Sequence, residues 1–197
     1  KGLVTLQQNK LLIHFFDLPL KIANTKKSSL QLYINFTRQS SSKIQAKWKN
    51  RVNVSMALPR YLPLIQEIKI RGLMSLEAIK LLQSKTTSSF EKRIKFQAVI
   101  ASFSSATHTN YRIAFLVRHY IKHNGIKRIF TTYEGHPWER LIFGFARKIN
   151  SKVKCIGYQH SIIFRKQHSI RRKLEKSFEP DYILCSGEHG FNQFKKI

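Results

Sequence analysis

Apolar residues recur with a helical spacing in two segments of the second half of the chain. Between residues 108 and 124 they return every three or four positions, as on a half-buried helix, and Gly125 stands where such a helix would end. The apolar positions of this first helix are Ile113, Leu116, Val117, Tyr120 and Ile121. A second helix is predicted from Pro137, whose fixed φ angle suits the first helical position. The apolar face of this second helix, which we expect to pack on a sheet, comprises Trp138, Leu141, Ile142, Phe145 and Ile149.

Three short apolar runs alternate with these helices. They are KRIFTTYE (127–134), KVKCIGYQH (152–160) and DYILCSG (181–187). Each run has the length and the branched or aromatic residues that are typical of a strand. The order helix, strand, helix, strand, connecting segment, strand is typical of a parallel sheet with crossover connections. The second half of the chain is therefore predicted to be α/β, with three parallel strands in one sheet and helices flanking it.

The first hundred residues carry weaker signals. LQLYINF (30–36) is predicted to form a strand, and SLEAIKLLQ (75–83) a short amphipathic helix with Ser75 as its N-cap. FEKRIKFQAVIASF (90–103) is predicted to form another helix with one apolar face. That face comprises Phe90, Ile94, Ala98 and Ala101.

The contrast between the two halves suggests a division near residue 104. Residues 1–104 would form the poorly diagnostic first part of the domain, and residues 105–197 its α/β second half. The chain begins without Met and ends in FNQFKKI, which has the pattern of a helix that has just begun. We therefore expect this sequence to be a fragment of a longer protein.

The charge balance is strongly positive. The 197 residues include 36 Lys and Arg against 10 Asp and Glu, which gives a formal net charge of +26. A hydrophobic content of 42% and an aromatic content of 12% are too high for a disordered tail. A surface of this charge attracts polyanions, whether nucleic acid, an anionic membrane leaflet or a phosphorylated substrate. Charge alone does not distinguish among these partners.

The cysteines and the lengths of the apolar runs indicate the cellular compartment of the chain. Cys155 and Cys185 lie inside apolar strand-like runs, so we interpret them as buried free thiols of a reducing compartment. No stretch approaches the roughly 20 apolar residues of a membrane span. The run LLIHFFDLPL (11–20) is too short for a signal peptide and is interrupted by His14 and Asp17.

Two glutamates surround the predicted break between strand and helix in the run TTYEGHPWER. If His136 is the N-cap, Glu139 occupies the third helical position, where a carboxylate accepts from free backbone N–H groups. Glu134 has no such structural role, because it ends the strand and is followed by Gly135. We interpret Glu134 as a general base or a hydroxyl-binding carboxylate, the alternative being a salt bridge to a nearby cation.

Polar residues also follow the other two predicted strands. Because the carboxyl ends of parallel strands meet at one edge of a sheet, these residues would line a common ligand-binding rim. The rim candidates are His136, Gln159, His160, Ser161, Glu188 and His189. Glutamate and histidine are suitable metal ligands, but their spacing here matches no compact metal-binding motif, so no metal site is predicted. Neither a nucleotide-binding glycine motif nor a serine-nucleophile elbow is present.

A basic segment, residues 162–178, separates the second and third predicted strands. Its cations could form a solvated helix face, or a rim that meets an anionic acceptor or a membrane surface. The cations that we assign to this second role are Arg165, Lys166, Arg171 and Arg172.

The runs YEGHPWERLIFGFARKIN, IGYQHS and PDYILCSGE together resemble the N-terminal half of bacterial surface-carbohydrate glycosyltransferases of the GT-B architecture. The resemblance extends over roughly residues 105–197 and is greatest to the capsule and lipopolysaccharide enzymes, with Kdo-transferase-like and polyglycerophosphate-transferase-like members. It implies a Rossmann-like N-terminal domain that binds the acceptor. A C-terminal domain, absent from this sequence, would bind the nucleotide-activated donor.

The resemblance also implies roles for individual residues. Glu134 corresponds to a catalytic base or acceptor-binding carboxylate, and Gln159 and His160 correspond to cleft residues. The implied reaction is an inverting transfer of a sugar or related group to a lipid-linked or polysaccharide acceptor, which becomes a growing cell-surface polysaccharide or lipopolysaccharide. The donor is a nucleotide sugar, and no further cofactor is implied. The implied location is peripheral, at the cytoplasmic face of the inner membrane. The acceptor half alone would be inactive because it lacks the donor contacts.

Two alternatives belong to other functional classes. The charge favours a basic nucleic-acid-binding α/β module without catalytic activity. The cations are spread along the chain, however, and no RRM, KH or zinc-finger signature is present. A non-catalytic basic scaffold is the third interpretation.

Overall fold

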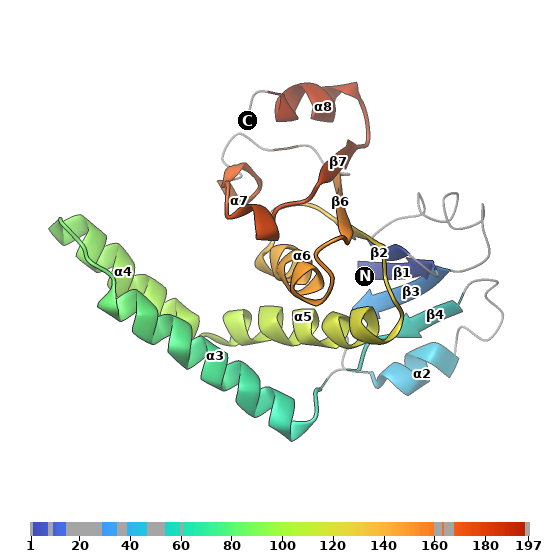
Figure 1. Cartoon of the computed structure of the whole chain (residues 1–197), viewed down its shortest axis with the longest axis horizontal. Helices are drawn as coiled ribbons and strands as arrows, with labels where there is room; N and C mark the ends of the chain where they lie inside the picture. The colour runs from blue at the N-terminus through green and yellow to red at the C-terminus, as the bar shows by residue number, and fades with distance from the viewer. Residues whose placement is uncertain are drawn as a thin grey trace. The chain divides into compact units, whose positions relative to one another are not determined.

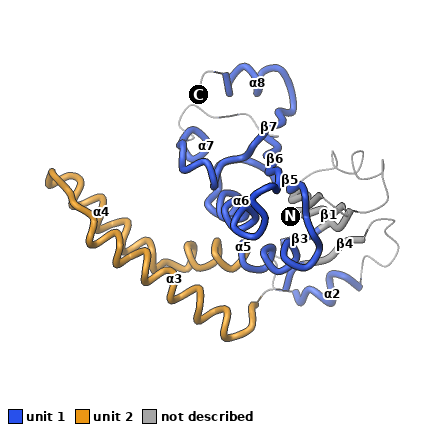
Figure 2. Tube along the Cα trace, in the orientation of Figure 1, with its two compact units in different colours: residues 1–60, 114–197 blue, residues 61–113 orange. Residues whose placement is uncertain are grey.

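The computed structural model describes most of the chain. The described residues are 2–7, 10–14, 29–34, 39–46, 54–59, 61–159, 163 and 168–195. The chain divides into two units (Figure 2). Unit 1 contains Lys1–Arg60 and Ala114–Ile197, and unit 2 contains Tyr61–Ile113. The boundary near residue 113 falls within helix α5 (Ser105–His123). The division near residue 104 that the sequence suggested stays a prediction.

Unit 1 contains a mixed sheet of seven described strands in the order β4-β3-β1-β2-β5-β6-β7 (Figure 1). The strands are β1 (Gly2–Gln7), β2 (Lys10–His14), β3 (Ser29–Ile34), β4 (Val54–Ala57), β5 (Arg128–Thr132), β6 (Lys154–Gln159) and β7 (Tyr182–Cys185). Strand β1 runs antiparallel to β2 and β3, whereas the other described pairings are parallel. Strand β3 confirms the strand predicted in LQLYINF, and its Leu32 and Ile34 are buried.

The three strands predicted in the second half are present and parallel. Thr132 of β5 pairs with Tyr158 of β6, and Gln159 of β6 pairs with Cys185 of β7. The carboxyl ends of β5, β6 and β7 therefore lie along one edge of the sheet. This part of the molecule is α/β, as the alternation of helical and strand-like segments in the sequence predicted. Cys155 is buried and Cys185 half-buried, and both are free thiols.

Helix α6 (Pro137–Ile149) connects β5 to β6 and begins at the predicted residue. Trp138 and Ile142 are buried as expected, but Leu141, Phe145 and Ile149 are only half-buried. The most deeply buried side chains are instead those of Glu139, Ile142, Phe143 and Ala146. The predicted apolar face therefore differs from the face that is buried, because more than one element packs on α6. The 3-10 helix η1 (Lys176–Phe178) also packs on it, with the Phe178 ring against Gly144.

Helix α5 confirms the first predicted helix. Its apolar residues Ile113, Leu116 and Val117 are buried, and Gly125 follows it with φ +55°, a left-handed conformation that favours glycine. The Phe115 ring lies edge-on to the Phe145 ring of α6, with their centroids 5.2 Å apart. The other helices that the structure describes in unit 1 are α2 (Ser41–Ala46), α7 (His168–Arg171) and α8 (Glu188–Phe194).

Unit 2 consists of α3 (Leu64–Gln83), α4 (Ser89–Ser102) and the beginning of α5. The short helix predicted at residues 75–83 was wrong in its extent, because Ser75 lies in the middle of α3 and caps nothing. Pro63 immediately precedes α3, where a backbone N–H would have no partner inside the helix, so the proline costs no hydrogen bond there. Helix α4 confirms the prediction for residues 90–103 and begins with a capping box.

In the part of the chain that the structure describes, no helix combines the length and the apolar character required to cross a membrane.

Candidate functional site at the carboxyl edge of the parallel strands

The turn between β5 and α6 depends on Gly135. Its φ angle is +79°, and a Cβ atom at this position would lie 2.4 Å from the carbonyl carbon of Ser169. The Ser169 hydroxyl donates to the carbonyl oxygen of Glu134 at 3.0 Å. The glycine therefore allows both the turn and the close approach of the chain's own α7 backbone, so that no other residue fits here without rearrangement.

Glu139 occupies the capping position that the sequence predicted. Its Oε2 atom accepts hydrogen bonds from the backbone N–H groups of His136, at 2.9 Å, and Glu134, at 3.0 Å. Its Oε1 atom accepts from the Thr132 hydroxyl at 3.1 Å. The side chain is fully buried (0% exposed), which the sequence did not indicate. Glu139 is thus a structural residue that joins the end of β5 to the first turn of α6.

Burial also alters the acidity of Glu139. Removal from water raises the pKa of Glu139 to about 8, and the nearby Glu134 carboxylate acts in the same direction. The two backbone N–H donors and the Thr132 hydroxyl oppose this rise because they stabilise the charged form.

Glu134 and His136 form a pair at the open side of the turn. The His136 Nε2 atom lies 3.3 Å from Glu134 Oε2. The His136 side chain is 51% exposed and the Glu134 side chain 25% exposed, so both reach solvent. The imidazole ring stacks on the Trp138 indole, with a centroid distance of 6.4 Å and an interplanar angle of 13°. A carboxylate held beside an imidazole can accept a proton from a hydroxyl group that approaches this edge.

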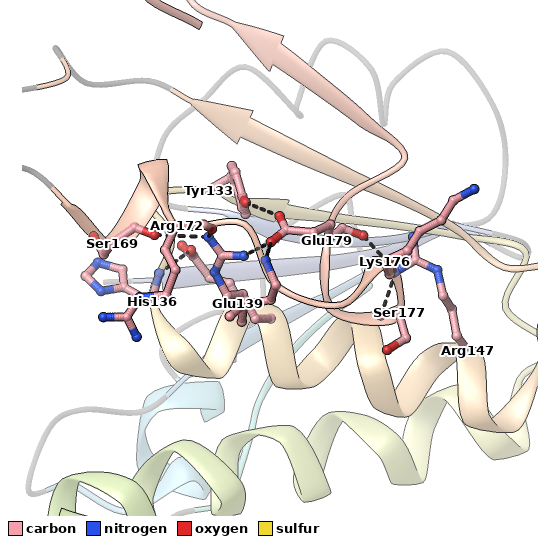
Figure 3. A network of polar contacts seen from close by, with 11 residues as sticks. Tyr133, His136, Glu139, Arg147, Ser169, Arg172, Lys176, Ser177 and Glu179 are labelled. Atoms are coloured by element: carbon pink, nitrogen blue, oxygen red, sulfur yellow. Dashed lines mark hydrogen bonds and ion pairs between the residues drawn. The ribbon is translucent and has the colours of Figure 1, made fainter. Parts of the chain in front are cut away.

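A polar network around Arg140 fixes the segment that leads into β7 (Figure 3). Arg140 of α6 is only 4% exposed and forms an ion pair with Glu179. The Tyr133 hydroxyl donates to the other Glu179 oxygen at 2.8 Å, and the Arg140 guanidinium lies over the Tyr133 ring. Arg140 also donates to the carbonyl oxygens of Ser169 at 3.0 Å and Arg172 at 2.7 Å. Burial and the hydrogen bond to Glu179 raise the pKa of Tyr133 well above its ordinary value.

Arg147, two turns further along α6, continues this network. It donates to the carbonyl oxygens of Lys176, Ser177 and Glu179 (Figure 3), and it forms an ion pair with Asp181 at 3.0 Å. Asp181 in turn accepts from the backbone N–H of Cys155 in β6 at 2.7 Å. Two arginines of one helix thus hold residues 168–181 beside the sheet.

Gln159 at the end of β6 is buried, with 1% of its surface exposed. Within the described part of the chain, neither its amide oxygen nor its amide nitrogen has a hydrogen-bond partner. A Cβ atom at Gly190 of α8 would lie 2.8 Å from its Oε1 atom, so α8 approaches this amide closely. An unpartnered buried amide is costly, so a group that supplies both a donor and an acceptor would stabilise Gln159.

The structure brings some of the predicted rim residues together and leaves others apart. Glu134 lies against His136, and Gln159 lies against the start of α8, where Glu188 and His189 are exposed. Arg172 is exposed and Arg171 half-buried in the described part of the basic segment. The remaining candidates, His160, Ser161, Arg165 and Lys166, lie outside the described residues. Among the described residues, no cluster of three or more potential ligand side chains could hold a metal ion.

The sequence analysis missed the network of Arg140, Arg147, Glu179 and Asp181. A signal was available, because the chain has only 10 acidic residues and two of them flank Pro180 immediately before β7. The partners could not be identified in this way, since Glu179 lies 39 positions from Arg140.

Comparison with protein-family models, with curated proteins and with solved structures found no match to this chain.

Proposed function

We propose that this chain is the acceptor-binding half of an inverting glycosyltransferase with the Rossmann-like GT-B architecture. The observation that carries the proposal is the Glu134–His136 pair, which follows β5 at the carboxyl edge of the parallel strands. Ligands of open α/β sheets bind at this edge. The product would be a cell-surface polysaccharide or lipopolysaccharide, as the resemblance of this segment implies.

In the proposed reaction, Glu134 accepts the proton of an acceptor hydroxyl group. The hydroxyl oxygen then attacks the anomeric carbon of a nucleotide-activated sugar. The bond from that carbon to the leaving phosphate oxygen breaks, and its electron pair departs with the nucleotide. His136 lies 3.3 Å from the carboxylate and orients it. A C-terminal domain of the same protein would bind the nucleotide sugar, which is a substrate and no resident cofactor.

The other residues of the edge would bind the acceptor. The amide of Gln159 has no hydrogen-bond partner among the described residues, and sugar hydroxyl groups can both donate to it and accept from it. Arg172 is exposed and basic, and is suited to the phosphate or carboxylate groups of an envelope acceptor. Such acceptors are assembled at the cytoplasmic face of the inner membrane, where the enzyme would act.

The test measures sugar transfer by the full-length gene product with the variant Glu134→Gln. Labelled CMP-, CDP-, UDP- and GDP-sugars would be incubated with membranes of the source organism as acceptor. We expect the variant to keep its melting temperature and to lose roughly 100-fold in turnover, the effect of a lost general base. Glu77→Gln removes an exposed carboxylate of α3 and is the matched control, which should remain active.

Full activity of Glu134→Gln would show that Glu134 is a salt-bridge partner of His136 and no catalyst. The net charge of +26 favours nucleic-acid binding as the second candidate function. Fluorescence anisotropy with a short RNA and a DNA duplex at physiological salt measures it directly. Tight, sequence-selective binding together with no sugar transfer would replace the enzymatic proposal by this one.

A further inference from the structure

Helix α3 has apolar residues on two opposite faces. Ile70, Met74 and Ala78 follow each other at intervals of four residues and are buried. A second row runs along the other side of the helix and remains exposed. It comprises Ile65, Ile68, Leu76 and Ile79, of which Ile65 is 64% exposed. The first row is covered by the protein, whereas the second row faces solvent.

Helix α4 repeats this arrangement. Val99 is its buried residue, whereas the face predicted from the sequence is turned outward, with Phe90 69% and Ile94 53% exposed. This face borders an open hollow of about 730 Å³ that is lined by residues of α4 alone. Phe96 and Ile100 are exposed as well. The two helices therefore present large apolar side chains to solvent, beyond what scattered surface residues require.

The charges of unit 2 are predominantly basic. Residues 61–113 contain eight Lys and Arg against three Glu. Each glutamate has a local partner: Glu67 pairs with Arg112, Glu77 pairs with Lys80, and Glu91 caps α4. The exposed cations are Lys69, Arg71, Lys80, Lys85, Lys92 and Arg93. Arg93 lines the hollow beside Phe90 and Ile94, so cationic and apolar groups share one surface.

We infer that the exposed face of the α3–α4 hairpin binds to an anionic lipid bilayer. Apolar side chains would enter the region between the headgroups and the acyl chains, while Lys and Arg reach the anionic headgroups. A second copy of the chain is a poorer partner, because each copy carries a net charge of +26. A nucleic-acid backbone is charged and polar, so it cannot bury rows of Ile, Leu and Phe. This inference is independent of the proposed enzymatic activity.

The test is co-sedimentation of the full chain with vesicles of phosphatidylcholine alone or mixed with phosphatidylglycerol. We expect binding to the mixed vesicles that weakens as salt is raised, since exposed charges are then screened. The double variant Phe90→Ser/Ile94→Ser should lower the partition coefficient by about 10-fold or more. The matched control Ile183→Ser/Leu184→Ser removes two exposed aliphatic side chains of β7 in unit 1 and should bind as the unchanged chain does.

A gain-of-signal variant and a folding check complete the test. The tryptophan emission of Phe90→Trp, after subtraction of the unchanged chain, should shift to the blue when mixed vesicles are added. Circular dichroism should show the same helix content for all variants. The inference is overturned by absent or lipid-independent binding, or by equal losses in the two double variants. Light scattering that shows a dimer, converted to a monomer by Phe90→Ser/Ile94→Ser without loss of vesicle binding, would assign this face to a second copy.

Discussion

Two glutamates five positions apart have opposite surroundings in this chain. Glu139 is fully buried and accepts three hydrogen bonds, whereas the Glu134 side chain is 25% exposed and faces His136. Their positions relative to the helix start allowed the sequence to predict a cap for Glu139. The burial of Glu139 was not predictable, because it results from packing of the whole turn.

The burial of Glu139 changes the expected effect of its substitution. In Glu139→Gln, the amide oxygen can still accept from the backbone N–H groups of Glu134 and His136, and the Thr132 hydroxyl can rotate to accept from the amide nitrogen. We expect a loss of less than about 1 kcal/mol in the free energy of unfolding. Glu139→Ala leaves the buried Thr132 hydroxyl and the part-buried N–H groups of Glu134 and His136 without this acceptor, and should cost about 3 kcal/mol. Urea denaturation measures both values, and equal losses would contradict the assigned hydrogen bonds.

The raised pKa of Glu139 predicts a pH dependence with a definite sign. Its pKa is about 8 in the folded chain against an ordinary value of 4.5. Between these values the folded state keeps a proton that the unfolded state has lost, so stability falls as the pH rises through this window. Glu139→Gln cannot titrate. The stability of the unchanged chain relative to this variant should therefore decline from pH 5 to 8, as measured by urea denaturation. Parallel pH profiles would show that Glu139 is ionised throughout.

At the scale of elements, α6 has two functions that its sequence pattern does not separate. One side packs on β5 and places the Glu134–His136 pair at the sheet edge. The other side holds residues 168–181 through Arg140 and Arg147. This second function positions β7 beside β6 and so completes the edge to which Gln159 belongs.

Substitution of Arg140 should therefore loosen a segment that is distant in sequence. Arg140→Ala leaves Glu179 and the carbonyl oxygens of Ser169 and Arg172 without their cation. We expect a loss of about 3 kcal/mol, the lower part of the range for breaking a buried ion pair, because the Glu179 side chain is 23% exposed. Hydrogen exchange should accelerate in peptides that cover residues 168–181. Lys148→Ala, an exposed neighbour on α6, is the control, and equal exchange in both variants would argue against the tether.

At the scale of the whole molecule, the net charge of +26 produces self-repulsion in the folded state. Salt screens charges that are separated by more than about 10 Å at 0.1 M ionic strength. We therefore expect the melting temperature to rise when sodium chloride is increased from low to physiological concentration. Differential scanning fluorimetry measures this shift. A melting temperature that falls with salt would indicate that attractive ion pairs, such as Arg147–Asp181, outweigh the repulsion.

The sequence by itself determined the local elements of the second half of the chain. Pro137 starts α6, Gly125 follows α5, and the period of the apolar residues separates strands from helices. These features depend on neighbours within one or two helical turns, which a sequence shows directly. The cap at Glu139 was predictable for the same reason.

Only the tertiary structure decided which apolar faces are covered and which distant residues meet. The periodicity of α4 predicted an apolar face, but not that Phe90 and Ile94 on that face would be exposed. Likewise, no local pattern indicates that Arg140 pairs with Glu179, or that the buried amide of Gln159 has no partner among the described residues. Burial and long-range pairing result from the packing of elements against one another, and the spacing of residues along the chain does not record that packing.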